Sequence, residues 1–232
     1  MVIDKIQEFY LNGFIQVSLK KDNTWKKLIK ELKSIQDDNL KPGFQLKSKY
    51  KGAMDLSPNV YDYSNVFLDL LKVNEIPELL FQLTQKTNIC YHIQIRKTLF
   101  GGSSYLSKHR DSFIKKGEII GNIPPPIKII FYPNFDNRKS RKLSVNTGSH
   151  LRFFKSFYLD KLINFFSKNE IIESSNSSIL IFNTMLYHSI FKEDNLNGSL
   201  RLIYSFGDDN ILKNYEHNQK LINIYKHLKH ND

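Results

Sequence analysis

The stretch SSILIFNTMLYHSIF, residues 177–191, contains two short runs rich in Ile, Leu, Phe and Tyr with a few polar residues between them. Runs of this length and composition are typical of β-strands separated by a turn. Further runs of the same kind occur from residue 88 onward, at residues 88–97, 126–133, 141–147 and 199–206. We therefore expect residues 88–206 to form an antiparallel sandwich or barrel.

The other segments are expected to be mostly helical. The pattern of a helix is found at residues 3–13, 23–36, 64–73, 76–85, 156–166 and 211–230, and residues 14–19 alternate like a short strand. In the second of these the apolar residues lie on one face, and Asn23 and Thr24 are expected to supply the N-cap. Helices first and strands afterwards predict a single α+β domain over residues 1–232 with a mainly β core. Its parts are a mostly helical flank (1–87), the β core (88–206) and a C-terminal helix (207–232).

The net charge of the 232-residue chain is +11, which raises the question of a nucleic-acid partner. Its lysines are scattered, and the clusters at residues 47–51 and 137–142 are short. A solvated surface is therefore favoured over a nucleic-acid groove. An anionic small-molecule substrate is compatible with the same charge.

The single cysteine, Cys90, excludes an internal disulfide framework and any multi-cysteine metal site. Asp4 and Glu8 lie where the apolar run of a signal peptide would be, and no apolar run approaches the roughly 20 residues that cross a bilayer. We expect a cytoplasmic protein with no membrane partner. The oligomeric state is not indicated by the sequence.

The segment SKHRDSF, residues 107–113, contains the tripeptide His109-Arg110-Asp111, which occurs in two unrelated kinds of enzyme. In a protein kinase this aspartate is followed five residues later by a magnesium-binding asparagine, whereas residue 116 is Lys. The chain also has no Gly-rich phosphate loop upstream and no Asp-Phe-Gly downstream. The sequence therefore excludes a kinase.

Non-haem iron sites use the same pattern, with two imidazoles and one carboxylate on one face of the metal. In an extended segment His109 and Asp111 project to the same side, and His188 on a distant strand could complete the set. Thirteen residues later Arg201 interrupts an apolar strand, where a guanidinium requires an anion such as the far carboxylate of 2-oxoglutarate. Singly, each residue also fits a packed or surface position; their order along the chain favours a metal site.

These motifs resemble those of the phytanoyl-CoA dioxygenase family. The similar stretches are IQEFYLNGFIQVS, HRD, LSVNTGSHL, SSILIFNTMLYHS and GSLRLIYSFG. The resemblance implies a double-stranded β-helix, or jelly roll, flanked by N-terminal and C-terminal helices. It also implies Fe(II) held by His109, Asp111 and His188, and 2-oxoglutarate held by Arg201. The implied reaction is an O₂-dependent hydroxylation of a C–H bond in a small organic substrate.

Five further residues are candidates for this site. Gln94 and Arg96 belong to the polar face of a strand that faces either solvent or a cavity; in a cavity, Gln94 would contact 2-oxoglutarate and Arg96 the substrate. Tyr105 could donate its hydroxyl to the keto acid. Ser149 and His150, in the Gly-Ser-His turn, could contact the substrate.

Two other functions remain open from the sequence. A jelly-roll protein with these residues could bind a small anion without turnover. The positive charge could instead serve an oxygenase that modifies nucleic acid. Oxygen consumption that depends on 2-oxoglutarate would separate the first from an enzyme, and steeply salt-dependent DNA or RNA binding would indicate the second.

Overall fold

A computed structural model describes most of the chain. The described residues are 2–50, 52–72, 76–98, 108–111, 113–115, 118–120, 127–133, 135, 140–152, 154–174, 178–190, 200–208 and 218–230. They form helices and antiparallel strands, so the expected α+β class is confirmed.

Most of the described helices lie close to where the sequence predicts them. The described helices are α1 (Val2–Asn12), α2 (Asn23–Gln36), α3 (Val60–Tyr63), α4 (Val66–Lys72), α5 (Ile76–Thr84), α6 (Phe157–Phe165), α8 (Gln219–His230) and the 3₁₀ turn η1 (Ser149–Leu151). Of these, α3 and η1 were not expected. The N-cap of α2 is Asp22, which has an extended backbone and accepts a hydrogen bond from the Trp25 amide. The expected cap at Asn23 and Thr24 is therefore wrong, because Asn23 already lies within the helix. Among the described helices, none is long and apolar enough to cross a bilayer.

The strands form a large sheet, a small sheet and a short hairpin, all antiparallel. The large sheet has the order β1 (Phe14–Ser18), β10 (Ser178–Asn183), β7 (Ile127–Phe131), β12 (Leu200–Gly207), β4 (Ile89–Thr98), β3 (Ala53–Ser57) and β2 (Gln45–Tyr50). The small sheet has the order β11 (Tyr187–Ile190), β8 (Ser140–Asn146) and β9 (Glu170–Ser174). The hairpin pairs β5 (Phe113–Lys115) with β6 (Glu118–Ile120).

The N-terminal flank contributes more to the large sheet than the sequence predicts. β1 lies where the sequence predicts a short strand and pairs with β10. β2 and β3 were not predicted and extend the sheet beyond β4. The sequence of β2, QLKSKY, is mostly polar and has no apolar run to mark it. An edge strand of this kind carries little hydrophobic signal, because it needs to bury few side chains.

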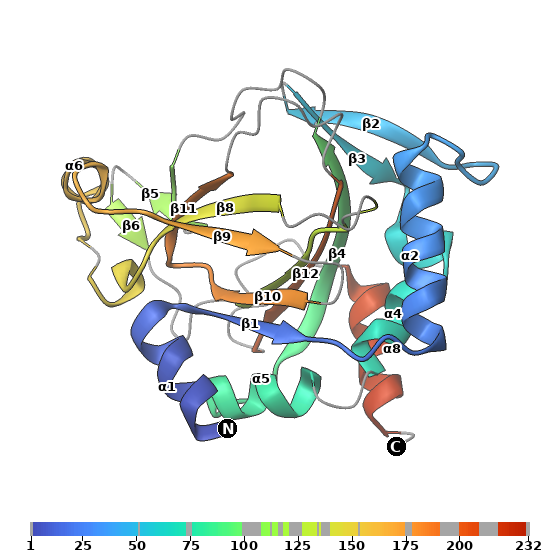
Figure 1. Ribbon diagram of the computed structural model, residues 1–232, viewed down its shortest axis with the longest axis horizontal. Helices are drawn as coiled ribbons and strands as arrows, with labels where there is room; N and C mark the ends of the chain where they lie inside the picture. The colour runs from blue at the N-terminus through green and yellow to red at the C-terminus, as the bar shows by residue number, and fades with distance from the viewer. Residues whose placement is uncertain are drawn as a thin grey trace.

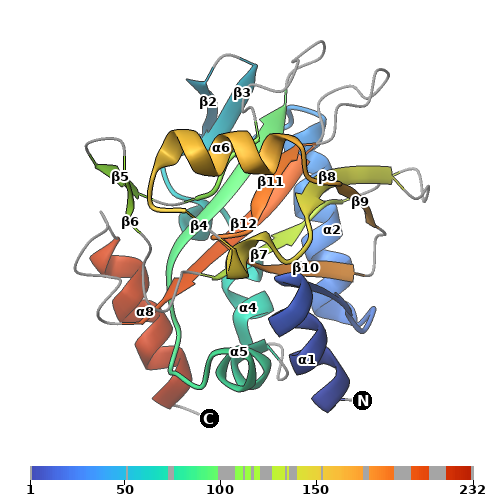
Figure 2. The same cartoon turned by 90° about the vertical axis from the view of Figure 1, so that its left-hand side faces the viewer.

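The large sheet lies between two layers (Figure 1). Helices α2, α4 and α8 lie on one side of it, and the small sheet lies on the other. Figure 1 also shows α6 on the side of the small sheet that is away from α2 and α4, and Figure 2, seen from that side, shows α6 in front of the sheets. Each face of the large sheet is therefore covered, one by helices and the other by strands.

Two apolar clusters match these layers. The cluster under the helices takes Leu202 and Tyr204 from β12, and the cluster between the sheets takes Ile203 from the same strand. Because successive side chains of a strand point to opposite faces, the odd-numbered residues of β12 face the small sheet. We call this the inner face of the large sheet.

Candidate metal centre

The His109-Arg110-Asp111 segment is paired with the chain that leads into β11. The His109 and His188 amides donate to each other's carbonyl oxygens at 2.9 and 2.8 Å, and the Asp111 amide donates to the Thr184 carbonyl at 2.9 Å. The segment thus lies antiparallel to β11 at the edge of the small sheet. This pairing brings together histidines that are 79 residues apart in the sequence.

The side chains of His109, Asp111 and His188 converge as the sequence predicts, and we call them the candidate triad. One ligand atom from each lies within 4.8 Å of the others. The His109 Nε2 atom is 3.4 Å from one Asp111 carboxylate oxygen, and the His188 Nε2 atom is 3.7 Å from the other. Two imidazole nitrogens and one carboxylate form a donor set that suits Fe(II), and the three residues could hold that ion.

The hydrogen bonds of His188 fix the nitrogen that can bind a metal. Its Nδ1 atom lies 2.7 Å from the Leu186 carbonyl oxygen, which can only accept, so Nδ1 carries the proton. The Nε2 atom, directed at Asp111, is then the free ligand atom. Burial, only partly opposed by the Asp111 charge, lowers the pKa of His188 to about 4, so the imidazole is neutral at pH 7.

Lys128 on β7 is a member of this site that the sequence analysis missed. Its ammonium lies 2.6 Å from the Asp111 carboxylate. Burial alone would raise the pKa of Asp111, but the charge of Lys128 and the hydrogen bond from His109 hold it well below its ordinary value. A signal was present, because Lys128 interrupts the apolar run PIKIIFYP much as Arg201 interrupts its own strand.

Arg201 lies on the inner face of the large sheet, as predicted for a core-facing arginine. It is 4% exposed and alternates with Leu200 and Leu202, which pack under the helices. Ile203, two residues further on, packs between the sheets. The guanidinium of Arg201 therefore projects from the same face as the side chains that line the space between the sheets.

The polar side chains of β4 share this inner face. Arg96 and Gln94 are the cross-strand partners of Arg201 and Ile203. Both donate to Asp55 on β3: Gln94 at 2.7 Å, and Arg96 through two nitrogens at 2.6 and 2.8 Å. Asp55, which the sequence analysis did not single out, thus neutralises Arg96. Of the two interpretations of this strand, the structure favours the inward-facing one for Arg96, which is 8% exposed.

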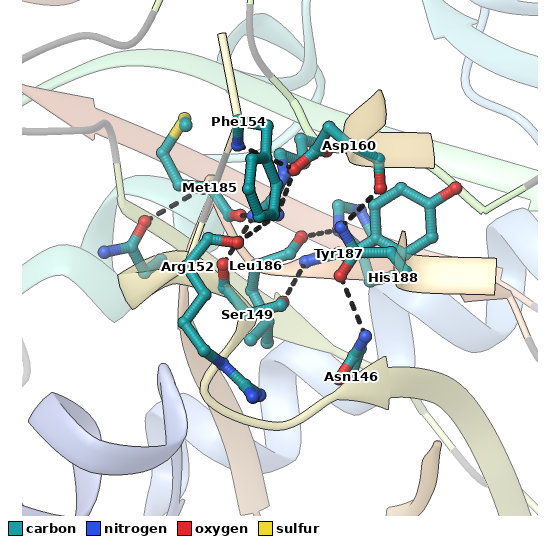
Figure 3. A network of polar contacts seen from close by, with 12 residues as sticks. Asn146, Ser149, Arg152, Phe154, Asp160, Met185, Leu186, Tyr187 and His188 are labelled. Carbon is teal, nitrogen blue, oxygen red and sulfur yellow. Dashed lines mark hydrogen bonds and ion pairs between the residues drawn. The ribbon is translucent and has the colours of Figure 1, made fainter. Parts of the chain in front are cut away.

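Arg110, between the two metal-ligand candidates, points into a separate cluster. Its guanidinium donates to both Asp160 carboxylate oxygens at 2.7 and 2.8 Å, and to the carbonyls of Ser149 (2.9 Å), Arg152 (3.3 Å) and Met185. Asp160 and Asn164 are the buried residues of α6. Figure 3 shows Asp160 of α6, Ser149 of η1 and Met185 close to one another. We call this group the Arg110 cluster.

The two residues of the Gly-Ser-His turn are engaged away from the candidate triad. The Ser149 hydroxyl is buried and accepts a hydrogen bond from the Tyr187 amide at 2.8 Å (Figure 3). His150 Nε2 lies 2.9 Å from the Tyr10 carbonyl of α1. The expected substrate contacts of Ser149 and His150 therefore find no support in the described geometry. Tyr105, the remaining candidate, lies outside the described residues.

Comparison with known proteins places the chain by its fold. No known protein-family model matches it, and no curated protein matches it. HygX from Streptomyces hygroscopicus, solved with nickel and 2-oxoglutarate bound, is 13% identical, with 89% of this chain and 87% of that chain covered and a TM-score of 0.61. AviO1 from Streptomyces viridochromogenes Tue57 is 14% identical over 90% of this chain and 96% of that chain, with a TM-score of 0.62.

A third similar structure is the non-haem α-ketoglutarate-dependent carbocyclase SnoK from nogalamycin biosynthesis. It is 8% identical over 92% of this chain and 90% of that chain, with a TM-score of 0.65. The chain therefore has the fold of these proteins, which include non-haem 2-oxoglutarate-dependent enzymes. The narrower resemblance to phytanoyl-CoA dioxygenases stays a prediction.

Proposed function

We propose that the chain is an Fe(II)- and 2-oxoglutarate-dependent oxygenase that acts on a C–H bond of a small organic substrate. The observation that carries this proposal is the convergence of His109, Asp111 and His188 in a protein whose sheet also buries Arg201. HygX, which shares the fold, was solved with a divalent metal and 2-oxoglutarate bound. A chance arrangement would not be expected to combine this donor set with that fold.

The strand order supports a double-stranded β-helix as the topology of this core. In chain order, β7, β10 and β12 belong to the large sheet, whereas β8, β9 and β11 belong to the small one. The segment of His109 adds to the small sheet beside β11. The chain thus passes repeatedly between two antiparallel sheets, as a jelly roll requires. The candidate triad touches both, since His188 is on β11 and Asp111 contacts Lys128 on β7.

Each described residue then has a role that follows from its position. His109, ionised Asp111 and neutral His188 would hold the metal. Arg201 would bind the far carboxylate of 2-oxoglutarate, because its planar guanidinium can form two parallel hydrogen bonds with a carboxylate. Asp55 would hold Gln94 and Arg96 in place beside it. Fe(II) and 2-oxoglutarate, when bound, would supply an oxidant able to attack an unactivated C–H bond, with decarboxylation to succinate.

Hydroxylation is the outcome that we propose at that bond. Two proteins of this fold are described as an epimerase, SnoN, and a carbocyclase, SnoK, so the fold supports other outcomes. The cationic side chains on the inner face, Lys128 and Arg201, favour a substrate or cosubstrate that carries a negative charge.

The test is oxygen consumption by the iron-loaded protein after 2-oxoglutarate is added, with succinate measured as the product. The variant Asp111→Ala serves as the control, because it removes one candidate ligand and leaves the inner-face residues of the large sheet unchanged. Consumption that produces succinate in the wild type and not in the variant would support the oxygenase. Iron binding without any 2-oxoglutarate-dependent consumption would contradict it.

A second candidate function is the binding of a small anion without turnover. The ion pair between Lys128 and Asp111 favours it, because the carboxylate of the candidate triad already has a cationic partner at 2.6 Å. In that case Lys128 rather than a metal would neutralise Asp111, and Arg201 would bind the anion. Equal affinity for 2-oxoglutarate with and without Fe(II), measured by calorimetry, would support this function over the oxygenase.

A further inference from the structure

The arginine of the His109-Arg110-Asp111 tripeptide has no role in the function proposed above. Its neighbours in sequence point toward each other, whereas its own side chain is 2% exposed and turned into the Arg110 cluster. A buried guanidinium is costly unless its charge is neutralised and its donors are used. Here Asp160 supplies the charge, and three backbone carbonyls accept further hydrogen bonds.

Two of the acceptors of Arg110 lie in or contact the segment that carries His188, the third member of the candidate triad. Met185, one of the acceptors, is three residues before His188. Ser149, another acceptor, also holds the Tyr187 amide through its hydroxyl. One guanidinium therefore connects the segment of His109 and Asp111 to the segment that carries His188.

The α6 helix completes this connection. Asp160 accepts from Arg110 through both carboxylate oxygens and also accepts from the Phe154 amide at 3.2 Å (Figure 3). Asn164, one turn later, accepts from Asn146 at 2.9 Å, at the end of β8. Because both ends of this polar face are attached, α6 fixes Asp160 relative to the small sheet.

We propose that Arg110 is a positioning residue for the metal site, with Asp160 as its partner. The inference rests on the proposed function, since it requires that the candidate triad binds a metal. Arg110 sets the spacing between the ligand pair His109 and Asp111 and the third ligand, His188. It does so from the side of the segment that faces away from the ligands.

The geometry of the pair calls for arginine rather than for any cation. The two nitrogens that reach Asp160 and the nitrogen that reaches the Ser149 and Met185 carbonyls are all parts of one planar group. A lysine at position 110 keeps the charge but has a single nitrogen atom, so it cannot bind the carboxylate and both carbonyls in this arrangement. The variant Arg110→Lys therefore tests whether the hydrogen-bond arrangement of Arg110, rather than its charge alone, holds the metal ligands in position.

The experiment measures the affinity of the purified protein for Co(II), a probe metal whose visible spectrum reports the ligand arrangement. The variants are Arg110→Lys and Asp160→Asn, compared at a temperature at which circular dichroism shows each to be folded. Leu28→Ala, in the core under the helices, is the matched control, because it destabilises the protein without contacting the site. Amide hydrogen exchange of His109 and Asp111 in the metal-free protein is a second measurement.

Both variants are expected to weaken Co(II) binding by about 10- to 100-fold and to change its spectrum, as residues that orient metal ligands typically do. They should also speed exchange of the His109 and Asp111 amides, whereas Leu28→Ala should keep Co(II) affinity within about twofold of the wild type. Wild-type affinity, spectrum and amide protection in a folded Arg110→Lys variant would overturn the inference. If the wild type itself binds no Co(II), the proposed metal site fails, and the inference fails with it.

Discussion

Two charged pairs lie on either side of the same tripeptide, and they differ in burial and in hydrogen bonding. The side chains of Arg110 and Asp160 are 2% and 3% exposed, and two hydrogen bonds join them. The side chains of Lys128 and Asp111 are 27% and 24% exposed, and one ion pair of 2.6 Å joins them. We call the buried pair of Arg110 and Asp160 the closed pair, and the partly exposed pair of Lys128 and Asp111 the open pair.

The difference indicates which pair serves the fold and which serves binding. Arg110 has acceptors on α6, on η1 and in the turn before β11, and it cannot leave them without an uncompensated buried charge. Lys128 has partial access to water, so Asp111 can exchange it for a metal ion at moderate cost. We therefore expect the closed pair to hold the segment in position and the open pair, which lies next to two histidines, to take part in metal binding.

The largest expected effect is on stability, from Asp160→Ala. Loss of one partner leaves the Arg110 charge buried, so the free energy of unfolding should fall by about 3–5 kcal/mol. Asp111→Ala, which leaves the partly exposed Lys128, should lower it by no more than about 1 kcal/mol. Urea unfolding of the metal-free variants measures both. Equal losses would remove the distinction between the closed and the open pair.

The next largest effect is on metal binding, from His188→Ala. Removal of a direct ligand should weaken Co(II) binding by more than about 100-fold, beyond the effect typical of residues that only orient ligands. His150→Ala is the matched control, because this histidine bonds to the Tyr10 carbonyl and not to the candidate triad. Equilibrium dialysis gives both affinities. A His188→Ala variant that binds as tightly as the wild type would show that the metal lies elsewhere.

Arg201→Lys tests the inner face at a distance from both pairs. Lysine keeps the charge but loses the second hydrogen bond to a carboxylate, so 2-oxoglutarate should bind about 10- to 100-fold more weakly to the metal-loaded protein. Arg152→Lys, at an exposed arginine, should leave that affinity unchanged. Isothermal titration calorimetry is the measurement. An unchanged affinity in Arg201→Lys would mean that another cation holds the far carboxylate.

The smallest expected effect comes from Lys128→Met, which removes the cationic partner of Asp111. Without the ammonium, Asp111 has no competing cation, and Co(II) should bind about fivefold more tightly, in keeping with the modest strength of a partly exposed ion pair. Competition against a fluorescent chelator resolves a change of this size. Weaker binding would show that Lys128 holds the carboxylate in place for the metal rather than competing with it.

The sequence predicted the residues whose signal is local or follows from chain order. Apolar runs gave most of the large sheet, and the order of His109, Asp111, His188 and Arg201 gave a site whose first three members do converge. Lys128 interrupts an apolar run, but the sequence does not indicate its partner, because the contact with Asp111 is set by the folding of β7 into the large sheet.

The role of Arg110 could not be read from the sequence for a related reason. The tripeptide indicated no role for its arginine, and Asp160 lies 50 residues away on a helix with no motif. The edge strand β2 was missed because its residues are mostly polar, and β3 was missed because its run, AMDLS, is short and interrupted by Asp55, the partner of Arg96. Polar pairs between residues far apart in the sequence are set by tertiary packing, which local sequence patterns do not indicate.

The most direct test of the central claim is an anaerobic titration of the protein with Fe(II) and 2-oxoglutarate, followed by visible absorption. If the candidate triad and Arg201 form one site, a weak charge-transfer band of the chelate should appear, vanish in His188→Ala and weaken in Arg201→Ala. The absence of any band in the folded wild-type protein would contradict the account, and anion binding without turnover would then take its place.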